Sequence, residues 1–181
     1  TLIVVHLGGG ISVSLHHDGK VADIINDEDG PFAPERSGVL PLFQVIEMMS
    51  TGKYDHKSAM KRVKTQGGLV AHLGTNDTRD VEKMIADGDE HARFIYEAMA
   101  LNVARNIARE APVVNGRIEG IILTGGIAYS EMFTKMVKDR VEFIAPVTVY
   151  AGENEMQSLA LGGLRVLRGE ETAKQFKKVV K

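Results

Sequence analysis

Three consecutive glycines near the start of the chain are the first feature that could carry chemistry. Gly8, Gly9 and Gly10 follow a β-branched run at 3–5 and precede Ser12. Only glycine adopts positive φ without steric cost and lets another group approach the backbone closely. Such a turn can present its N–H groups to an anion, as in phosphate nests. The alternative is a tight hairpin with nothing bound.

A second glycine pair, Gly125 and Gly126, follows a nearly continuous apolar run at 118–123 and precedes an expected helix over 129–139. In open α/β sheets, ligands bind beyond the carboxyl ends of the strands. Two glycine turns that each follow an expected buried strand therefore indicate nucleotide binding. The alternative for this pair is close packing between the strand and the helix.

Two side chains near these turns could assist phosphoryl transfer. Arg36 lies in a run with two prolines, Gly30-Pro-Phe-Ala-Pro-Glu-Arg-Ser-Gly38, and proline stiffens the backbone. A fixed guanidinium can stabilise the charge of a transferring phosphoryl group; the alternative is a surface ion pair with Glu35 or another acid. His6 could donate a hydrogen bond to an oxyanion, although a histidine in a strand is more often structural.

The acidic run Glu153-Asn154-Glu155 stands between an expected strand at 147–150 and an expected helix over 155–168. Mg²⁺ typically binds one or two carboxylates together with substrate phosphates, so this run could hold that ion. The alternative, which we favour from the residues alone, is helix capping with Asn154 as N-cap and Glu155 in the first turn. The two interpretations are compatible.

Composition sets the class of protein. The chain has 181 residues, 44% hydrophobic and 25% charged, typical of one soluble globular domain. A net charge of −2 gives no indication of nucleic acid or membrane partners, and the absence of cysteine excludes disulfides and thiolate catalysis. No apolar stretch approaches the roughly 20 residues of a membrane helix, and no signal peptide is visible. We therefore expect a cytoplasmic protein.

The order of elements that must position these residues predicts an α/β lobe with a mixed β-sheet. A meander of three strands comes first, with Asp18-Gly19 as a hairpin signal. Helices follow, then a β-α-β-α tail, and 170–181 are expected to fray. The expected strands are 2–6, 11–17, 20–26, 118–123 and 147–150; the expected helices are 42–50, 56–65, 78–86, 89–111, 129–139 and 155–168.

Taken together, the motifs resemble the acetate kinase family of acid kinases, and within it the butyrate kinases. The residues that carry the resemblance span nearly the whole chain: His6-Leu-Gly-Gly-Gly-Ile-Ser-Val13, Gly30-Pro-Phe-Ala-Pro-Glu-Arg-Ser-Gly38, Leu73-Gly-Thr-Asn-Asp-Thr-Arg79, Leu123-Thr-Gly-Gly-Ile-Ala-Tyr-Ser130 and Glu153-Asn-Glu-Met-Gln-Ser-Leu-Ala160. The resemblance implies a ribonuclease H-like lobe of the sugar kinase/Hsp70/actin superfamily, in which two lobes close over ATP.

The resemblance also implies roles for individual residues. The nucleotide would bind at three places: Gly8, Gly9, Gly10 and Ser12 for the phosphates, Asp77, Thr78 and Arg79 beside the adenine, and Gly125, Gly126 and Ile127 around the adenosine. Arg36 matches the catalytic arginine, and His6 matches the histidine near the transferred phosphoryl group. Glu155, or as a second choice Glu153, matches the acidic residue linked to Mg²⁺.

The implied reaction converts butanoate and ATP to butanoyl phosphate and ADP, reversibly, with Mg²⁺. The resemblance makes residues 1–181 a single C-terminal lobe; the chain begins at Thr1 and contains nothing like the family's first lobe, which carries a further phosphate loop and part of the acid pocket. We expect that lobe to belong to the same polypeptide, and the protein to form a homodimer. The loop 26–29 looks shorter than the family pattern, so its contacts with the substrate are in question.

Three alternatives remain open at this point. The chain could be a nucleotide-binding module without turnover, or its specificity could be that of an acetate or propionate kinase. It could also be a related kinase that phosphorylates a sugar hydroxyl. That chemistry needs an aspartate as base, for which Asp27 and Asp29 are the loop candidates.

Overall fold

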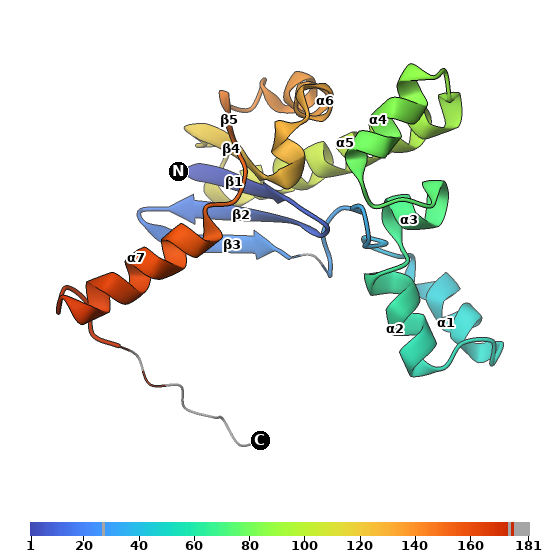
Figure 1. The fold of residues 1–181 in the computed structure, drawn as a ribbon, viewed down its shortest axis with the longest axis horizontal. Helices are drawn as coiled ribbons and strands as arrows, with labels where there is room; N and C mark the ends of the chain where they lie inside the picture. The colour runs from blue at the N-terminus through green and yellow to red at the C-terminus, as the bar shows by residue number, and fades with distance from the viewer. Residues whose placement is uncertain (27, 174, 176–181) are drawn as a thin grey trace.

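A five-stranded mixed sheet organises the molecule, which is described here by a computed structural model that covers residues 1–26, 28–173 and 175 (Figure 1). The strand order is β3-β2-β1-β4-β5. β1 pairs antiparallel with β2 and parallel with β4, and β5 extends the parallel part. The sheet thus confirms the predicted mixed topology. The strands are β1 Leu2–Leu7, β2 Ile11–His17, β3 Lys20–Ile25, β4 Gly120–Gly125 and β5 Val147–Ala151.

Capping side chains stand at the starts of three helices. Asp55 forms a capping box with Ser58, and the side chains of Asp89 and Ser130 accept hydrogen bonds from the first turns of their helices. The apolar run at 69–73 is also helical. The helices are α1 Leu42–Ser50, α2 His56–Lys64, α3 Gly68–Leu73, α4 Thr78–Ala86, α5 Glu90–Glu110, α6 Glu131–Val141 and α7 Glu155–Leu167, with short 3₁₀ turns η1 Ala111–Val114 and η2 Gly126–Tyr129.

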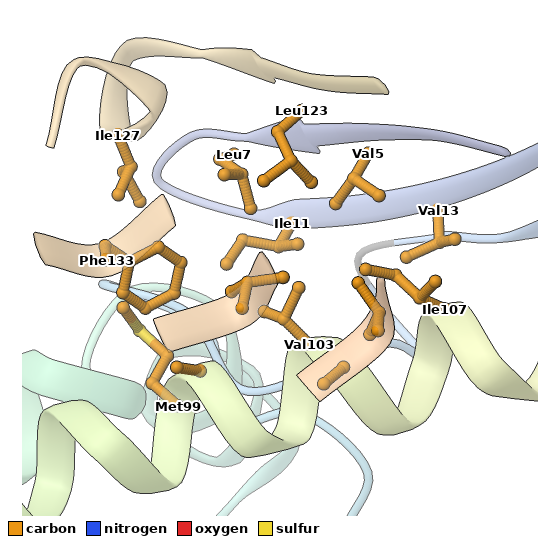
Figure 2. Close-up of a cluster of buried hydrophobic side chains, with 14 of the residues drawn as sticks. Val5, Leu7, Ile11, Val13, Met99, Val103, Ile107, Leu123, Ile127 and Phe133 are labelled. Atoms are coloured by element: carbon orange, nitrogen blue, oxygen red, sulfur yellow. The ribbon is translucent and has the colours of Figure 1, made fainter. Parts of the chain in front are cut away.

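The core lies between one face of the sheet and α5. Residues alternate in burial along β1 and β2, because successive side chains of a strand point to opposite faces. Figure 2 shows Leu7 and Ile11 of the sheet above Met99 and Val103 of α5, with Phe133 of α6 closing one end. This packing fixes the ends of β1 and β4, on which the glycine turns lie.

The structure tests two expectations about burial. The apolar residues of α5 cover more than one face, which predicts a helix packed between several elements. Its buried residues do contact the sheet and the neighbouring helices, although Phe94 and Leu101 are exposed. The run at 118–123 predicted a strand buried on both faces. In β4 the residues Ile121 and Leu123 are buried, whereas Ile122 between them is only half-buried. A continuous apolar run therefore marked a strand without showing how completely its second face is covered.

Some expectations fall on residues outside the described part of the chain. Asp27, the first candidate for an aspartate base, lies there, as do residues 174 and 176–181 of the segment expected to fray. Within the described ranges, no helix has both the length and the apolar character that crossing a membrane requires.

We expect Phe133→Ala to destabilise the chain by about 3–5 kcal/mol, the usual cost of emptying a large aromatic site in a core. Phe133 is 0% exposed and its ring lies 5.1 Å from that of Tyr96. Phe143→Ala is the matched control, because that side chain is 81% exposed. Urea unfolding should separate the two variants; equal stabilities would contradict the assigned core.

Candidate functional site

The carboxyl ends of the parallel strands meet at a cavity of about 720 Å³. Five separate segments contribute to it: the turn after β1, the loop after β3, the start of α4, the turn after β4 and the residues after β5. We call it the glycine cavity. Its lining residues are Gly8, Gly9, Pro34, Asn76, Asp77, Thr78, Arg79, Glu82, Gly126, Ile127, Tyr129, Ser130 and Glu153.

The first glycine turn keeps two of its amides available. The Gly8 N–H donates to the Gly10 carbonyl at 3.1 Å, whereas the N–H groups of Gly9 and Gly10 donate no hydrogen bond to any described residue. The Gly9 carbonyl accepts from the Glu35 N–H at 3.1 Å, which ties the loop after β3 to this turn. Unused amides beside a cavity can bind an anion.

Space, rather than an unusual backbone angle, favours glycine at position 8, whereas a Cβ at Gly9 would make only ordinary contacts with Glu35 at 3.7 Å. Neither Gly8 nor Gly9 has a positive φ, which corrects the reason first given for them. A Cβ at Gly8 would lie 3.1 Å from the His6 ring and 3.3 Å from the Gly10 carbonyl oxygen. Any side chain there would crowd the turn.

The two glycines of the second turn lie in different surroundings, one packed against β1 and the other open to the cavity. Gly125 has a φ of +93°, and a Cβ there would lie 2.5 Å from the Leu7 carbonyl oxygen. This glycine therefore lets β4 approach β1, whereas the packing alternative had placed the close contact between the strand and the following helix. Gly126 has no atom within 4 Å of its Cβ position and lines the cavity. Of the pair, Gly126 is the one that leaves room for a ligand.

His6 and Glu153 form an ion-pair contact at the edge of the cavity. The His6 Nε2 atom lies 3.1 Å from Glu153 Oε1, and both side chains are half-exposed. Glu155, the first choice for Mg²⁺, is exposed in the first turn of α7 and is absent from the cavity lining. Asn154 occupies the N-cap position, but its side chain makes no capping hydrogen bond, which corrects the capping expectation. The geometry thus favours Glu153 over Glu155 as a group facing the cavity.

Asp77, Thr78 and Arg79 lie together on the cavity wall, as the sequence predicted for neighbouring residues of one site. The Asp77 carboxylate caps α4 through the Arg79 N–H at 2.9 Å. It also accepts from Arg79 Nε at 2.9 Å and Nη2 at 2.6 Å. These hydrogen bonds lower the pKa of Asp77 to about 2. The Arg79 side chain itself remains exposed, so it can meet a ligand.

Glu82, Ser130 and Tyr96 form a polar cluster at the cavity wall that the sequence analysis missed. The Tyr96 hydroxyl donates to Glu82 Oε1 at 2.8 Å, and the Ser130 hydroxyl donates to the same oxygen. Burial raises the pKa of Tyr96. Glu82 stands four residues after Thr78 on α4, so its position on the same helix face was the available signal.

Arg36 lies elsewhere in this structure. Its Nη1 atom donates to the Lys64 carbonyl at 2.6 Å, and its side chain lines a second, smaller pocket of about 190 Å³ with Met60 and Val63 of α2. Among the described residues that surround the glycine cavity, Arg36 is absent. Its backbone nevertheless follows Glu35, which is bonded to the glycine turn.

The structure therefore brings together only part of the predicted site. The predicted residues on the cavity wall are Gly8, Gly9, Asp77, Thr78, Arg79, Gly126, Ile127 and the second-choice Glu153. His6 contacts Glu153, and Ser12 pairs with His6 across the β1–β2 ladder. Gly10, Gly125, Arg36 and Glu155 do not line the cavity in the described structure.

A divalent cation would find few protein ligands here. Within the described ranges, no group of three or more His, Cys, Asp or Glu side chains could hold a metal ion by itself. Mg²⁺ commonly uses one or two carboxylates and completes its shell with water and substrate phosphates. Glu153 beside the unused glycine amides fits that pattern, whereas a site built from protein ligands alone does not.

Comparison with known proteins identifies the class. The fold matches acetate kinase from Porphyromonas gingivalis with a TM-score of 0.83 at 18% identity, over 92% of this chain and 49% of that one. It matches a propionate kinase from Francisella tularensis subsp. tularensis SCHU S4 with a TM-score of 0.77 at 23% identity, over 86% and 47%. A ROK family protein from Streptococcus pneumoniae matches more weakly, with a TM-score of 0.53 at 18% identity, over 93% and 59%. These likenesses define an actin-like ATPase fold.

The family follows from sequence. The model of the acetokinase family matches residues 1–175, so the chain belongs to the acetokinase family. It is 50% identical over 176 residues to a probable butyrate kinase 2 from Caldanaerobacter subterraneus subsp. tengcongensis. The aligned residues make up 97% of this chain and 50% of that protein. The chain spans about half the length of the relatives it matches.

The Asp77–Arg79 contact predicts a measurable pKa. We expect the Asp77 carboxyl to titrate near 2 in an NMR pH titration, and to move up towards its ordinary value of 3.8 in Arg79→Ala. Because the folded-state pKa is lowered, the stabilising contribution of Asp77 is present above the unfolded pKa and is lost as the pH falls towards 2.

Arg93→Ala is the control for this titration, since Arg93 pairs with Glu90 on α5 and lies outside the cavity wall. If Asp77 still titrated near 2 in Arg79→Ala, the backbone cap rather than the guanidinium would hold its pKa down.

Proposed function

We propose that this chain is the nucleotide-binding lobe of a carboxylate kinase, which transfers the γ-phosphoryl group of ATP to a short-chain acid. The observation that carries the proposal is the glycine cavity. It joins a turn with unused amides, an open glycine turn and a carboxylate at the carboxyl ends of three parallel strands. The acetokinase family match extends over the same residues.

ATP would lie along the cavity with its phosphates at the first glycine turn. The amides of Gly9 and Gly10 would donate to phosphate oxygens, since no described residue uses them. The adenosine would lie against Gly126 and Ile127, where the wall is open, with the exposed Arg79 side chain beside the base. Planar guanidinium groups stack well on aromatic rings.

Mg²⁺ would be held by Glu153 together with nucleotide phosphates, and when bound it would neutralise part of the charge on the transferring group. His6 contacts the same carboxylate and holds it in place at 3.1 Å. We infer that this pair, rather than Glu155, is the acidic side of the site.

The reaction needs little covalent help from the protein. The acid is already ionised near neutral pH, so its carboxylate oxygen attacks the γ-phosphorus directly while the bond from that phosphorus to the bridging oxygen of ADP breaks. Catalysis then depends on alignment and on charge stabilisation. Arg36 is the candidate for the second task, once its guanidinium leaves the Lys64 carbonyl and turns towards the glycine turn that Glu35 contacts.

Butanoate or a related short or branched acid is the proposed substrate. Its support is the 50% identity to a probable butyrate kinase. We further propose that a first lobe completes the acid pocket and that the whole protein forms a homodimer in the cytoplasm. The length of this chain, about half that of its relatives, supports the missing lobe.

Gly126→Ala should weaken ATP binding by about tenfold or more without lowering stability, because its Cβ would enter open cavity space and no protein atom lies within 4 Å. A methyl group that crowds the bound adenosine costs about 1–3 kcal/mol, the usual cost of overpacking, and every 1.4 kcal/mol is about tenfold in affinity. Gly163→Ala in α7 is the matched control, since its Cβ also meets nothing within 4 Å. Calorimetric titration with ATP would decide; equal affinity in all three proteins would contradict this placement of the nucleotide.

Arg36→Ala should lower kcat by about 10³-fold or more, the scale seen for arginine fingers in phosphoryl transfer. The measurement is an acyl-hydroxamate assay on the polypeptide that carries both lobes. Arg62→Ala on α2 is a suitable control, because Arg62 lines neither of the two pockets described above. A loss below about tenfold would make Arg36 a structural residue.

The same two assays separate the proposal from its alternatives. ATP binding without hydroxamate formation would identify a nucleotide-binding module without turnover. Turnover with acetate or propionate in preference to butanoate would change the assigned acid. Phosphorylation of a sugar would point to an aspartate base; of the two candidates, Asp29 accepts the Asn26 N–H at 3.1 Å and Asp27 lies outside the described residues.

A further inference from the structure

A third pocket, of about 550 Å³, lies between α5 and the loop after β3, and it shares no lining residue with the glycine cavity. We call it the arginine pocket. Four polar residues of α5 form one wall: Asn102, Arg105, Asn106 and Arg109. Phe32, Ser37 and Val39 of the loop form the other wall.

Two arginines dominate its charge. Arg105 and Arg109 stand four residues apart, so they lie on the same face of α5. Neither makes an ion pair or a side-chain hydrogen bond with any described residue, and no acidic residue lines the pocket. Like charges at this spacing repel, so an anion that binds between them relieves an unfavourable interaction.

The neighbouring acid, Glu110, does not line the pocket. Glu110 is only 1% exposed, and its carboxylate makes no hydrogen bond with a described residue. Burial raises its pKa to about 7, with Asp23 contributing in the same direction and Arg109 opposing it. The Glu110 carboxylate is therefore buried outside the pocket and does not occupy the space that faces the two guanidinium groups.

The two asparagines give the pocket a fixed polar floor. Asn106 is 9% exposed, and its Nδ2 atom donates to the Asn102 carbonyl at 2.9 Å. This contact holds the Asn106 amide in one orientation and leaves the Asn102 side-chain NH₂ group without an acceptor among the described residues. Amide donors beside guanidinium groups suit the several oxygens of a tetrahedral oxyanion.

We propose that the arginine pocket binds a small phosphoryl dianion. Arg105 and Arg109 would bind its charge, and the Asn102 side-chain NH₂ group would donate a hydrogen bond to one of its oxygens. Two sources supply this chemistry: inorganic phosphate, and an acyl phosphate whose apolar tail would contact Phe32 and Val39. The site stands on its own residues and does not depend on the proposed kinase activity.

Binding here would also tighten the loop that carries Arg36. Ser37 and Val39 lie on either side of Gly38 in that loop, and their amides donate to the Val63 and Gly30 carbonyls at 3.0 and 3.3 Å. A dianion bridging α5 and these residues would restrain both contacts. We therefore expect amide hydrogen exchange with solvent to be slower at Ser37 and Val39 when the dianion is bound.

The test is a titration of the full chain with inorganic phosphate, followed by ¹H–¹⁵N NMR at constant ionic strength with chloride as the reference anion. Shifts should appear at the side chains of Asn102, Arg105 and Arg109. The double variant Arg105→Gln/Arg109→Gln should bind phosphate at least about tenfold more weakly, as expected for loss of charged hydrogen bonds. Arg93→Gln, on the same helix but outside the pocket, should bind as the wild type does.

Each result bears on the proposal. Three results would overturn it: NMR chemical-shift changes confined to the first glycine turn, no binding of phosphate, or equal binding by the wild type and the double variant. Butanoate binding as tightly as phosphate would overturn the assignment of a dianion. Titration with butanoyl phosphate separates the two sources: tighter binding than phosphate identifies the acyl phosphate, and equal binding identifies the free ion. If the double variant fails to fold, the wild-type shift map alone decides.

Discussion

The parallel pairing of β1 with β4 is the constraint on which the site depends. At the end of this pairing Gly125 has a positive φ of +93° and brings β4 against the Leu7 carbonyl, an approach that a Cβ would block. The first glycine turn leaves β1 at the same end as Gly126 leaves β4. Because both turns begin from one rigid pair of strands, the open space between them is set by the core rather than by the loops.

The three pockets follow from how the loop after β3 is attached. Glu35 binds the glycine turn through its backbone, Arg36 binds the end of α2, and Ser37 faces both the small pocket and the arginine pocket. The short, proline-containing loop after β3 therefore contributes to the lining of all three pockets. The positions of all three pockets thus depend on the same few backbone atoms.

Local signals in the sequence predicted the elements well. The capping box at Asp55, the cap at Asp89 and the Asp18-Gly19 turn act through adjacent residues, so their outcome does not depend on distant partners. The motifs also predicted which segments meet at the cavity. Sequence could not distinguish the positions of Gly125 and Gly126, show that Glu153 rather than Glu155 lines the cavity, or show that the Arg36 guanidinium donates to the Lys64 carbonyl. Those facts depend on contacts between residues far apart in the chain, as does the Glu82–Tyr96 hydrogen bond.

Assembly of this sheet has a cost in time. The hairpins of β1, β2 and β3 close over short loops. The parallel half of the sheet can form only after Ile121 has been synthesised, because Ile3 pairs with it. Pairings between distant segments are slow to form, and a ribosome delivers the N-terminal residues first. The hairpins can therefore be complete while the glycine cavity still lacks one wall. Among the three pockets of this chain, the glycine cavity would therefore be the last to be completed.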